Sequence, residues 1–253
     1  MRKAQFFYLL RRGLLSGGLN FIKEGLVMAS KFTTQGLNFP AQGSATFNGS
    51  SDYIQTNNAF SHTNHTIAAW VYVENTSASK FVFDSRDSGT DGILLYMRHS
   101  EAPIYAINNS SIVGTTTHAN EWVFVTGTYD GTTQKLYING SQNIAATTSK
   151  TISTTTDATI GKQAYSDAEW FKGNLANVAI WNRALSSDEI NSVMWKSYEG
   201  LEGAESNGLQ AWYSLDDISS PAASLANMEQ LAADKDATIE NKAAITAAIN
   251  ALS

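Results

Sequence analysis

Hydrophobic and polar residues alternate in short segments from about residue 39 to residue 217. The segments with this alternation are 45–47, 66–73, 80–83, 93–97, 122–129, 135–138, 159–160 and 178–181. A period of two places successive side chains on opposite faces of a strand, so each segment is predicted to be a β-strand. The turns between them are predicted at Asn48-Gly49, Asp91-Gly92, Asp130-Gly131 and Asn139-Gly140. This spacing of strands and turns predicts an all-β protein, a sandwich of antiparallel sheets.

Three segments have a helical pattern instead. Ser186 and Glu189 have the spacing of a capping box and precede an apolar helical turn. After Pro221 the chain becomes Ala-rich, with apolar residues at roughly helical spacing: Leu225, Met228, Leu231, Ile239, Ile245, Ile249 and Leu252. This pattern predicts a helical C-terminal tail that docks on the body or on another subunit, whereas the imperfect heptad gives a long coiled coil little support.

The third helical pattern lies in the N-terminal arm. Phe6, Phe7, Leu10 and Leu14 are spaced as one face of a short amphipathic helix that ends at Gly17-Gly18. Arg11 and Arg12 interrupt the apolar run after about five residues, whereas a signal peptide needs about 7–15 and a membrane span about 20. Neither is therefore predicted. The arm is expected to pack on its own domain or on a neighbouring subunit. Membrane-surface binding and an unstructured leader are the alternatives.

These patterns divide the chain into a basic amphipathic arm (1–38), a β-sandwich (39–218) and an Ala-rich tail (219–253). The first 31 residues hold six basic residues and one acidic residue, whereas the rest hold 11 basic and 22 acidic residues. A basic arm on an acidic body suggests that the arm contacts something negative, while the body repels nucleic acid. The chain contains no cysteine, which excludes a disulfide scaffold, thiolate zinc sites and a cysteine nucleophile.

The segment WVFVTGTYDGTTQKLYING (122–140) resembles the laminin G-like, concanavalin A-like lectin superfamily. The other matching segments, in the order of the family, are ATFNGSSDYIQ (45–55), TIAAWVYV (66–73), GNLANVAIWNRALSSDEI (173–190) and GLQAWYSLDD (208–217). The last two also resemble the pentraxin branch. The resemblance implies a jelly-roll sandwich over about residues 39–217. In it, Trp70, Trp122, Trp181 and Trp212 are expected to fill the core between the sheets.

Catalytic chemistry is not evident in the sequence. Glycosidases of this superfamily carry carboxylates that alternate on one strand, such as Glu-x-Asp-x-x-Glu, and no such run exists here. Glu121, Glu169 and Glu189 stand alone, the four histidines form no ligand cluster, and no nucleotide-binding or nucleophile-elbow motif occurs. We therefore expect no enzymatic activity.

Calcium is the one candidate cofactor, and the resemblance implies its place. In related lectin-like proteins the ion lies at one edge of the sandwich, held by loops that follow two strands. The matching segments here supply Asp87 and Asp91 (83–97) and Gln163 and Asp167 (161–174). Gly92 replaces the Asn that follows the pentraxin ligand at the position of Asp91. Because hard cations need several converging oxygen ligands, this set predicts a weak calcium site or ordinary turn residues.

The same second loop carries three aromatic residues, Tyr165, Trp170 and Phe171. These rings are candidates for contact with a sugar or with a protein. Trp170 has an alternative role, in which it covers the edge of the sheet.

Two functions follow as hypotheses. The first is a structural or adhesion protein on a phage virion, as a capsid decoration or tail-associated component. Its sandwich is displayed, and its arm residues Phe6, Phe7, Leu10, Arg11 and Arg12 dock on other copies or other virion proteins. This hypothesis places a lectin-like domain on a virion or extracellular surface without an export signal. The alternative is a free or exported carbohydrate-binding lectin, with or without calcium.

Overall fold

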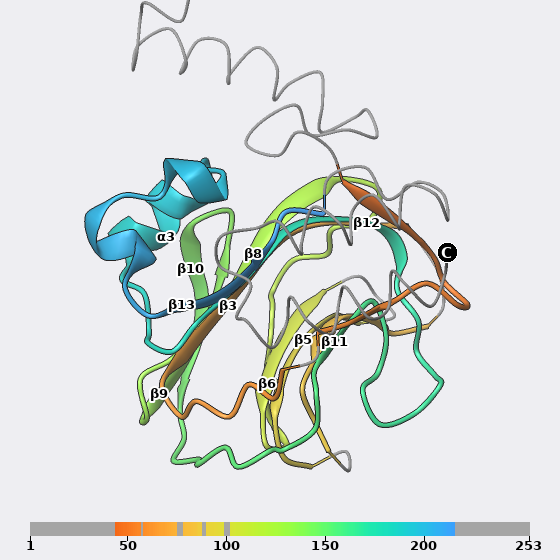
Figure 1. The fold of residues 1–253 in the computed structure, drawn as a ribbon, viewed down its shortest axis with the longest axis horizontal. Coiled ribbons are helices and arrows are strands. Elements are labelled where there is room, and N and C mark those ends of the chain that lie inside the picture. The colour runs from red at the N-terminus through yellow and green to blue at the C-terminus, as the bar shows by residue number, and fades with distance from the viewer. Residues whose placement is uncertain (1–43, 57, 75–77, 88–89, 99–101, 216–253) are drawn as a thin grey trace, which may run out of the picture.

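The computed structural model describes residues 44–56, 58–74, 78–87, 90–98 and 102–215. Within these residues the chain forms two antiparallel sheets that face each other as a sandwich (Figure 1). One sheet has seven strands in the order β1-β12-β3-β8-β9-β10, with β13 also paired to β12. The other has six strands in the order β2-β11-β4-β5-β6-β7. The predicted all-β sandwich is confirmed.

The seven-stranded sheet consists of β1 (Ala45–Asn48), β3 (His65–Val73), β8 (Trp122–Tyr129), β9 (Thr133–Ile138), β10 (Ser141–Thr147), β12 (Lys172–Trp181) and β13 (Leu209–Tyr213). The six-stranded sheet consists of β2 (Ile54–Gln55), β4 (Lys80–Asp84), β5 (Ile93–Met97), β6 (Pro103–Ile107), β7 (Ser110–Val113) and β11 (Thr159–Ile160). The helical elements described are α3 (Ser187–Val193) and the 3-10 helices η1 (Tyr198–Gly200) and η2 (Gly203–Ser206). Gly131 and Gly140, in two of the predicted turns, have positive φ, as such turns require.

Pairing between distant segments brings two loops to the same end of the molecule. β1 pairs with β12 and β2 pairs with β11, so residues near 50 lie beside residues more than a hundred positions later. β11 also pairs with β4. The turn between β1 and β2 and the loop between β11 and β12 therefore lie together, at the right of Figure 1. These two loops and the end of β4 frame the candidate site.

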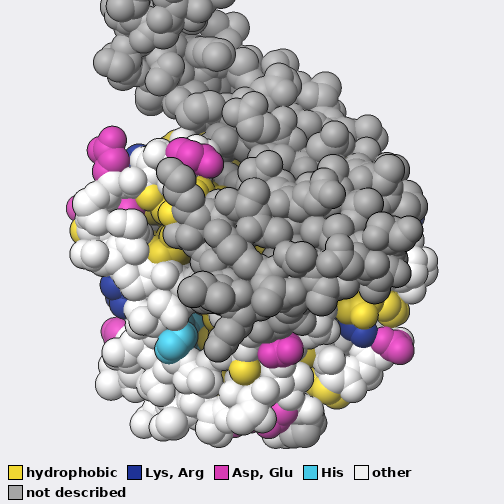
Figure 2. Space-filling view, in the orientation of Figure 1, with side chains coloured by type: hydrophobic (Ala, Val, Ile, Leu, Met, Phe, Trp, Pro, Cys, Tyr) yellow, Lys and Arg dark blue, Asp and Glu magenta, His cyan; other side chains and the backbone are white. Residues whose placement is uncertain are grey.

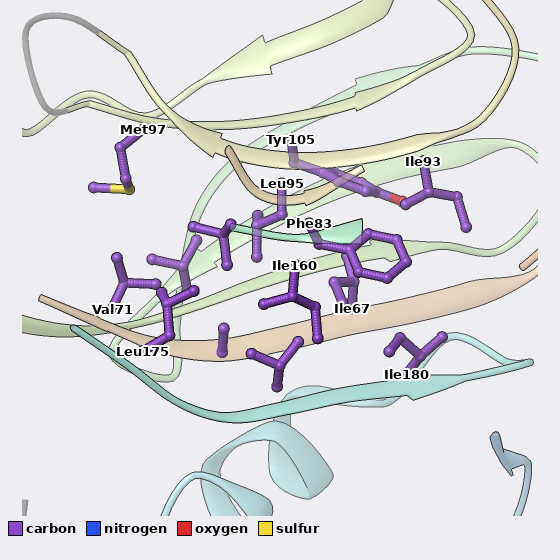
Figure 3. Packing of buried hydrophobic residues seen from close by; sticks show 14 of the residues in the cluster. Ile67, Val71, Phe83, Ile93, Leu95, Met97, Tyr105, Ile160, Leu175 and Ile180 are labelled. Atoms are coloured by element: carbon purple, nitrogen blue, oxygen red, sulfur yellow. The ribbon is translucent and has the colours of Figure 1, made fainter. Parts of the chain in front are cut away.

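A continuous apolar core lies between the two sheets. Figure 3 shows side chains from β3 and β12, such as Ile67 and Leu175, directed toward side chains from β5 and β6, such as Leu95 and Tyr105. All of these are fully or almost fully buried. Apolar burial on this scale is the main stabilising contribution to such a fold.

A second apolar cluster lies on the outer face of the seven-stranded sheet, beneath α3. It contains the four tryptophans Trp70, Trp122, Trp181 and Trp212, together with Ile190 and Val193 of α3. The tryptophans are buried, but the expectation that they fill the space between the sheets is wrong. Trp70 alternates with Ala69 and Val71, which face the inter-sheet core, so its own ring points to the opposite face.

The helix that covers these tryptophans begins as predicted. Ser186 Oγ accepts a hydrogen bond from the Glu189 backbone N–H (3.2 Å), and Glu189 Oε2 accepts one from the Ser186 backbone N–H (2.8 Å). This reciprocal pair is the predicted capping box. The predicted N-terminal helix and the C-terminal tail helix lie outside the described residues.

One edge of the seven-stranded sheet is irregular. In the part of the chain that the structure describes, β10 pairs with β9 only, and the register shifts between Gln142 and Ile144. The residue between them, Asn143, donates from Nδ2 to Thr115 Oγ1 (2.9 Å) and accepts from the Thr115 backbone N–H (2.9 Å). A bulge of this kind interrupts the row of backbone groups that a strand edge presents.

Candidate functional site

An exposed group of aromatic rings lies where the two loops meet. Tyr53 is 44% exposed and Tyr165 is 41% exposed, and in the described residues they are the only large apolar side chains that remain so open. The half-buried Trp170 packs edge-on against Tyr53, with 5.7 Å between ring centroids. We call Tyr53, Tyr165 and Trp170 the aromatic surface. In Figure 2, hydrophobic, basic and acidic side chains lie together at the right of the molecule, the end that carries these loops.

Lys162 supports one half of the aromatic surface. Its side chain is about one tenth exposed, and its ammonium lies 4.3 Å from the centroid of the Tyr53 ring and 5.2 Å from that of Trp170. A cation over a ring face is attracted by the ring's negative charge density. Lys162 Nζ also donates to Asp167 Oδ1 at 2.6 Å, and the Asp167 side chain is 82% exposed.

Arg86 supports the other half. Its guanidinium lies 4.9 Å from the centroid of the Tyr165 ring and 5.3 Å from that of Phe81 in β4. Phe81 and Leu94 form a small apolar cluster separate from the inter-sheet core, which places this contact on the outer face of the six-stranded sheet. Tyr165 is fixed further because Gln163 Nε2 donates to its hydroxyl at 2.7 Å.

The charge of Arg86 is balanced by a buried carboxylate, Asp84, at the end of β4. Arg86 donates to Asp84 Oδ1 from Nε (3.0 Å) and to Oδ2 from Nη2 (2.8 Å). Burial alone would lower the pKa of Arg86, but the hydrogen bonds and charge of Asp84 outweigh it and raise the pKa above its ordinary value. Asp84 Oδ2 also accepts a hydrogen bond from the Ala164 backbone N–H at 3.2 Å. This carboxylate therefore joins the end of β4 to the loop that carries Tyr165.

The four candidate calcium ligands do not converge. Asp167 pairs with Lys162, whereas Asp91 accepts from Ser153 Oγ at 2.5 Å. Gln163 Oε1 accepts a hydrogen bond from Ser166, and the Asp87 backbone N–H donates to the Asp91 carbonyl at 3.4 Å. Among the described residues no three carboxylates or histidines come together in a group that could hold a metal ion. Because calcium needs several oxygens directed at one point, these residues do not fit the ion.

The remaining candidate site residues are Phe171 and the five residues of the N-terminal arm. Phe171 is fully buried and packs edge-on against Phe47 in the inter-sheet core. Its ring therefore cannot contact a ligand, unlike Tyr165 and Trp170. The arm residues Phe6, Phe7, Leu10, Arg11 and Arg12 lie outside the described residues.

Three residues of this site could not be identified from the sequence. Tyr53, Lys162 and Arg86 lie in separate segments, and nothing in the local pattern of any one segment distinguishes them. Only the pairing of β11 with both β2 and β4 brings them together.

Two carboxylates elsewhere in the described residues are held in ion pairs beside α3. Glu189 pairs with Arg183 at 2.7 Å, and Glu205 pairs with Lys196 at 2.7 Å. Both pairs lie beside α3, on the sheet opposite the aromatic surface. No helix in the described part of the chain is long and apolar enough to cross a membrane.

A family model for the concanavalin A-like lectin/glucanases superfamily matches residues 48–191. This range covers more than half of the chain and ends within α3, before β13. A search of curated proteins found no match.

Solved structures share the fold at low sequence identity. A candidate carbohydrate-binding protein from Bacteroides ovatus has a TM-score of 0.56 and 18% identity, over 69% of this chain and 52% of that one. The chain thus spans about half the length of that protein. The Ruminococcus gnavus IT-sialidase CBM40, solved with α2,3-sialyllactose, has a TM-score of 0.50 and 12% identity, over 59% and 95% of the two chains. A heptameric pentraxin from Limulus polyphemus has a TM-score of 0.48 and 16% identity, over 59% and 80%.

Proposed function

The chain belongs to the concanavalin A-like lectin/glucanases superfamily, and we propose that within it this protein is a non-catalytic carbohydrate-binding protein. The observation that carries the proposal is the aromatic surface. Two of its rings are the most exposed large apolar side chains of the described structure, although they lie far apart in the sequence. Exposed rings that are held in place at a loop edge are suited to contact a ligand.

The chemistry of the aromatic surface suits a sugar. The face of an aromatic ring carries partial negative charge, and the C–H groups on one face of a pyranose carry partial positive charge, so the two faces attract. Lys162 and Arg86 each occupy one face of a ring, Tyr53 and Tyr165 respectively, which restricts the ring's orientation. Asp167, whose side chain is exposed, adds a polar group beside the rings that can bond sugar hydroxyls.

Two further observations support binding without catalysis. The Bacteroides and Ruminococcus structures, which share this fold, are a candidate carbohydrate-binding protein and a CBM40 bound to a sialylated sugar. At the aromatic surface, Asp84 is neutralised by Arg86, and Asp167 is paired with Lys162. Glycosidases instead need two carboxyl groups about 5–10 Å apart, one as the acid and the other as nucleophile or base.

The test is a glycan array with the full chain, followed by titration of the best glycan with variants. Tyr53→Ala and Trp170→Ala are each expected to weaken binding about ten-fold or more, as loss of a central aromatic contact does. Tyr53→Phe retains the ring and is expected to retain binding. If no glycan binds, or if both alanine variants bind as tightly as the unchanged chain, the proposal is wrong.

We also propose that the protein is displayed on a surface, as a virion component whose arm docks on other subunits. The supporting observation is the opposite charge of the first 31 residues and the rest of the chain. Light scattering of the full chain is expected to show a discrete oligomer or a larger assembly. A variant with Phe6→Ser, Phe7→Ser and Leu10→Ser is expected to be smaller, as is one with Arg11→Glu and Arg12→Glu. A monomeric full chain would leave the free lectin as the better description.

A further inference from the structure

We propose that two basic side chains of the protein itself, Arg86 and Lys162, perform the structural role of a bound metal ion at this edge of the sandwich. They hold together the end of β4 and the two loops that carry the aromatic surface, so the surface forms without calcium. The inference extends the proposed function, because it concerns how the same site is assembled.

Arg86 connects the first pair of segments. With Asp84 it forms a buried ion pair in which the Asp84 side chain is inaccessible to solvent and that of Arg86 is about one tenth exposed. The Asp84 carboxylate accepts hydrogen bonds from the Arg86 backbone N–H (2.9 Å) and side chain on the β4 side. It also accepts one from the Ala164 backbone N–H on the β11–β12 side. Donors from both sides thus occupy the two oxygens of Asp84, and these sides are the ones that a bridging metal ion would join: the end of β4 and the loop between β11 and β12.

Lys162 connects the second pair. It lies in the loop between β11 and β12, and its ammonium packs against Tyr53, which precedes β2. Within its own loop it contacts both Trp170 and Asp167. One ammonium therefore fixes the two ends of the loop and the adjacent turn, as a multidentate metal centre does with oxygen ligands.

The positive charges lie where a cation would compete with them. Asp167, one of the candidate calcium ligands, is already paired with Lys162, and Ala164 adjoins Gln163, another candidate. A divalent ion entering this edge would meet two positive side chains at short range, which opposes its binding. The arrangement that places Arg86 and Lys162 at this edge is thus the same one in which the candidate ligands do not converge.

The first experiment measures calcium dependence without any glycan. Thermal unfolding of the full chain is recorded with excess calcium and with excess chelator, and the two melting temperatures are expected to coincide. A domain of this size that held calcium in roughly hundred-fold excess over its dissociation constant would melt about 5–10 °C higher with the ion. Such a shift would overturn the inference.

The second experiment examines the loop directly by hydrogen exchange of the segment 161–170. Lys162→Met keeps the aliphatic stem, and the pair Asp84→Asn with Arg86→Met removes both buried charges together. In each variant the backbone amide hydrogens of this segment are expected to exchange about ten-fold faster or more, because the contacts that close the loop are lost. Calcium is expected to leave the exchange of the unchanged chain the same.

The matched control is Lys172→Met, which removes an ammonium from an exposed pair with Glu74. It is expected to leave exchange of the loop unchanged. Circular dichroism and a cooperative melt identify any variant that does not fold, and Lys162→Met leaves no buried charge unpaired. If both sets of variants fold, and the amide hydrogens of this segment exchange in them at the same rate as in the control, the inference is wrong.

The two proposals fail in different ways. A chain that binds no glycan contradicts the proposed function but leaves the thermal and exchange results intact. A chain whose loop is ordered by calcium, and which then binds a glycan, supports the function and contradicts the inference.

Discussion

At the scale of single residues, His65 shows how burial fixes a protonation state. Its side chain is inaccessible to solvent in the core between the sheets. Nδ1 faces two backbone carbonyls, those of His62 and Thr63 (3.0 Å each), so Nδ1 carries the proton. Nε2 therefore accepts from the Tyr105 hydroxyl, at 2.6 Å. Both nitrogens of the neutral ring are satisfied, and a second proton on Nε2 would reverse the bond with Tyr105 and deprive the Tyr105 O–H of this acceptor.

The first prediction concerns the pH dependence of stability. Burial lowers the pKa of His65 from 6.5 to about 4, despite the backbone hydrogen bonds that oppose this shift. Between these values the unfolded chain binds the proton and the folded chain does not, so stability is complete above pH 6.5 and falls as the pH decreases toward 4. The expected loss is about 3 kcal/mol. Urea unfolding at several pH values measures it.

The control is His65→Gln, which cannot titrate in this range. It is expected to be less stable at neutral pH. Its free energy of unfolding is expected to fall much less between pH 6.5 and 4 than that of the unchanged chain. An unchanged chain whose unfolding free energy is constant over that range would contradict the pKa assigned to His65.

The candidate site was only partly predictable at this scale. Tyr165 and Trp170 are recognisable because aromatic residues in a polar loop have few neighbours in the sequence to bury them. Phe171 was placed with them wrongly, since it is the residue at which the loop turns back into the core. Arg86 and Lys162 give no signal, because an ordinary basic residue acquires its role only from the rings and carboxylates that the fold places beside it.

At the scale of elements, α3 is a short helix whose beginning is well defined by sequence. Its capping box is joined by Arg183, whose hydrogen bonds to Glu189 are the largest of the influences that lower the pKa of that carboxyl to about 2. The helix packs Ile190 and Val193 over the tryptophan cluster. In so short a helix, packing and capping contribute more than intrinsic propensity.

The second prediction is that Ser186→Ala lowers the free energy of unfolding by about 1 kcal/mol, because the Glu189 backbone N–H loses its acceptor. Denaturant unfolding measures the change. Ser187→Ala alters the next residue, which the structure places at the first position inside the helix, and is expected to have a much smaller effect. Equal losses in the two variants would show that the capping bond contributes nothing.

The strands differ in how clearly the sequence marks them. β3 and β8 combine alternation with β-branched and aromatic residues, and both were predicted with ends within a residue of those observed. β6 was missed because it is buried on both faces and so does not alternate. β10 was missed because its polar and alanine residues have low strand propensity, and its pairing with β9 supplies what the local sequence lacks.

At the scale of the whole molecule, the seven-stranded sheet separates two apolar layers. The inter-sheet core lies on one face, and the tryptophan cluster under α3 lies on the other. β13 belongs to both layers, since Tyr213 faces the first and Trp212 the second. The Trp181 indole N–H also donates to the Glu205 carbonyl, just before β13, at 2.7 Å. The fold is therefore incomplete at residue 191, where the family match ends.

The third prediction follows from this arrangement. A chain of residues 39–218 is expected to unfold in one cooperative transition, as a domain with its own core does. A chain of residues 39–191 lacks β13. It is expected to show no cooperative transition and to aggregate, because β12 loses a paired strand and Trp181 loses residues that pack against it. Calorimetry of the two chains makes the comparison. A cooperative transition in the shorter chain would show that β13 is dispensable.

The bulge at Asn143 has a consequence for copies of the protein at high local density. An uninterrupted outer edge on β10 would let two neighbouring molecules align strand against strand and extend one sheet through both, a process that can continue into fibres. The register shift and the turn of Asn143 toward Thr115 break the repeat that such growth requires. Crowded molecules can thus stand side by side as separate bodies, each with its aromatic surface free.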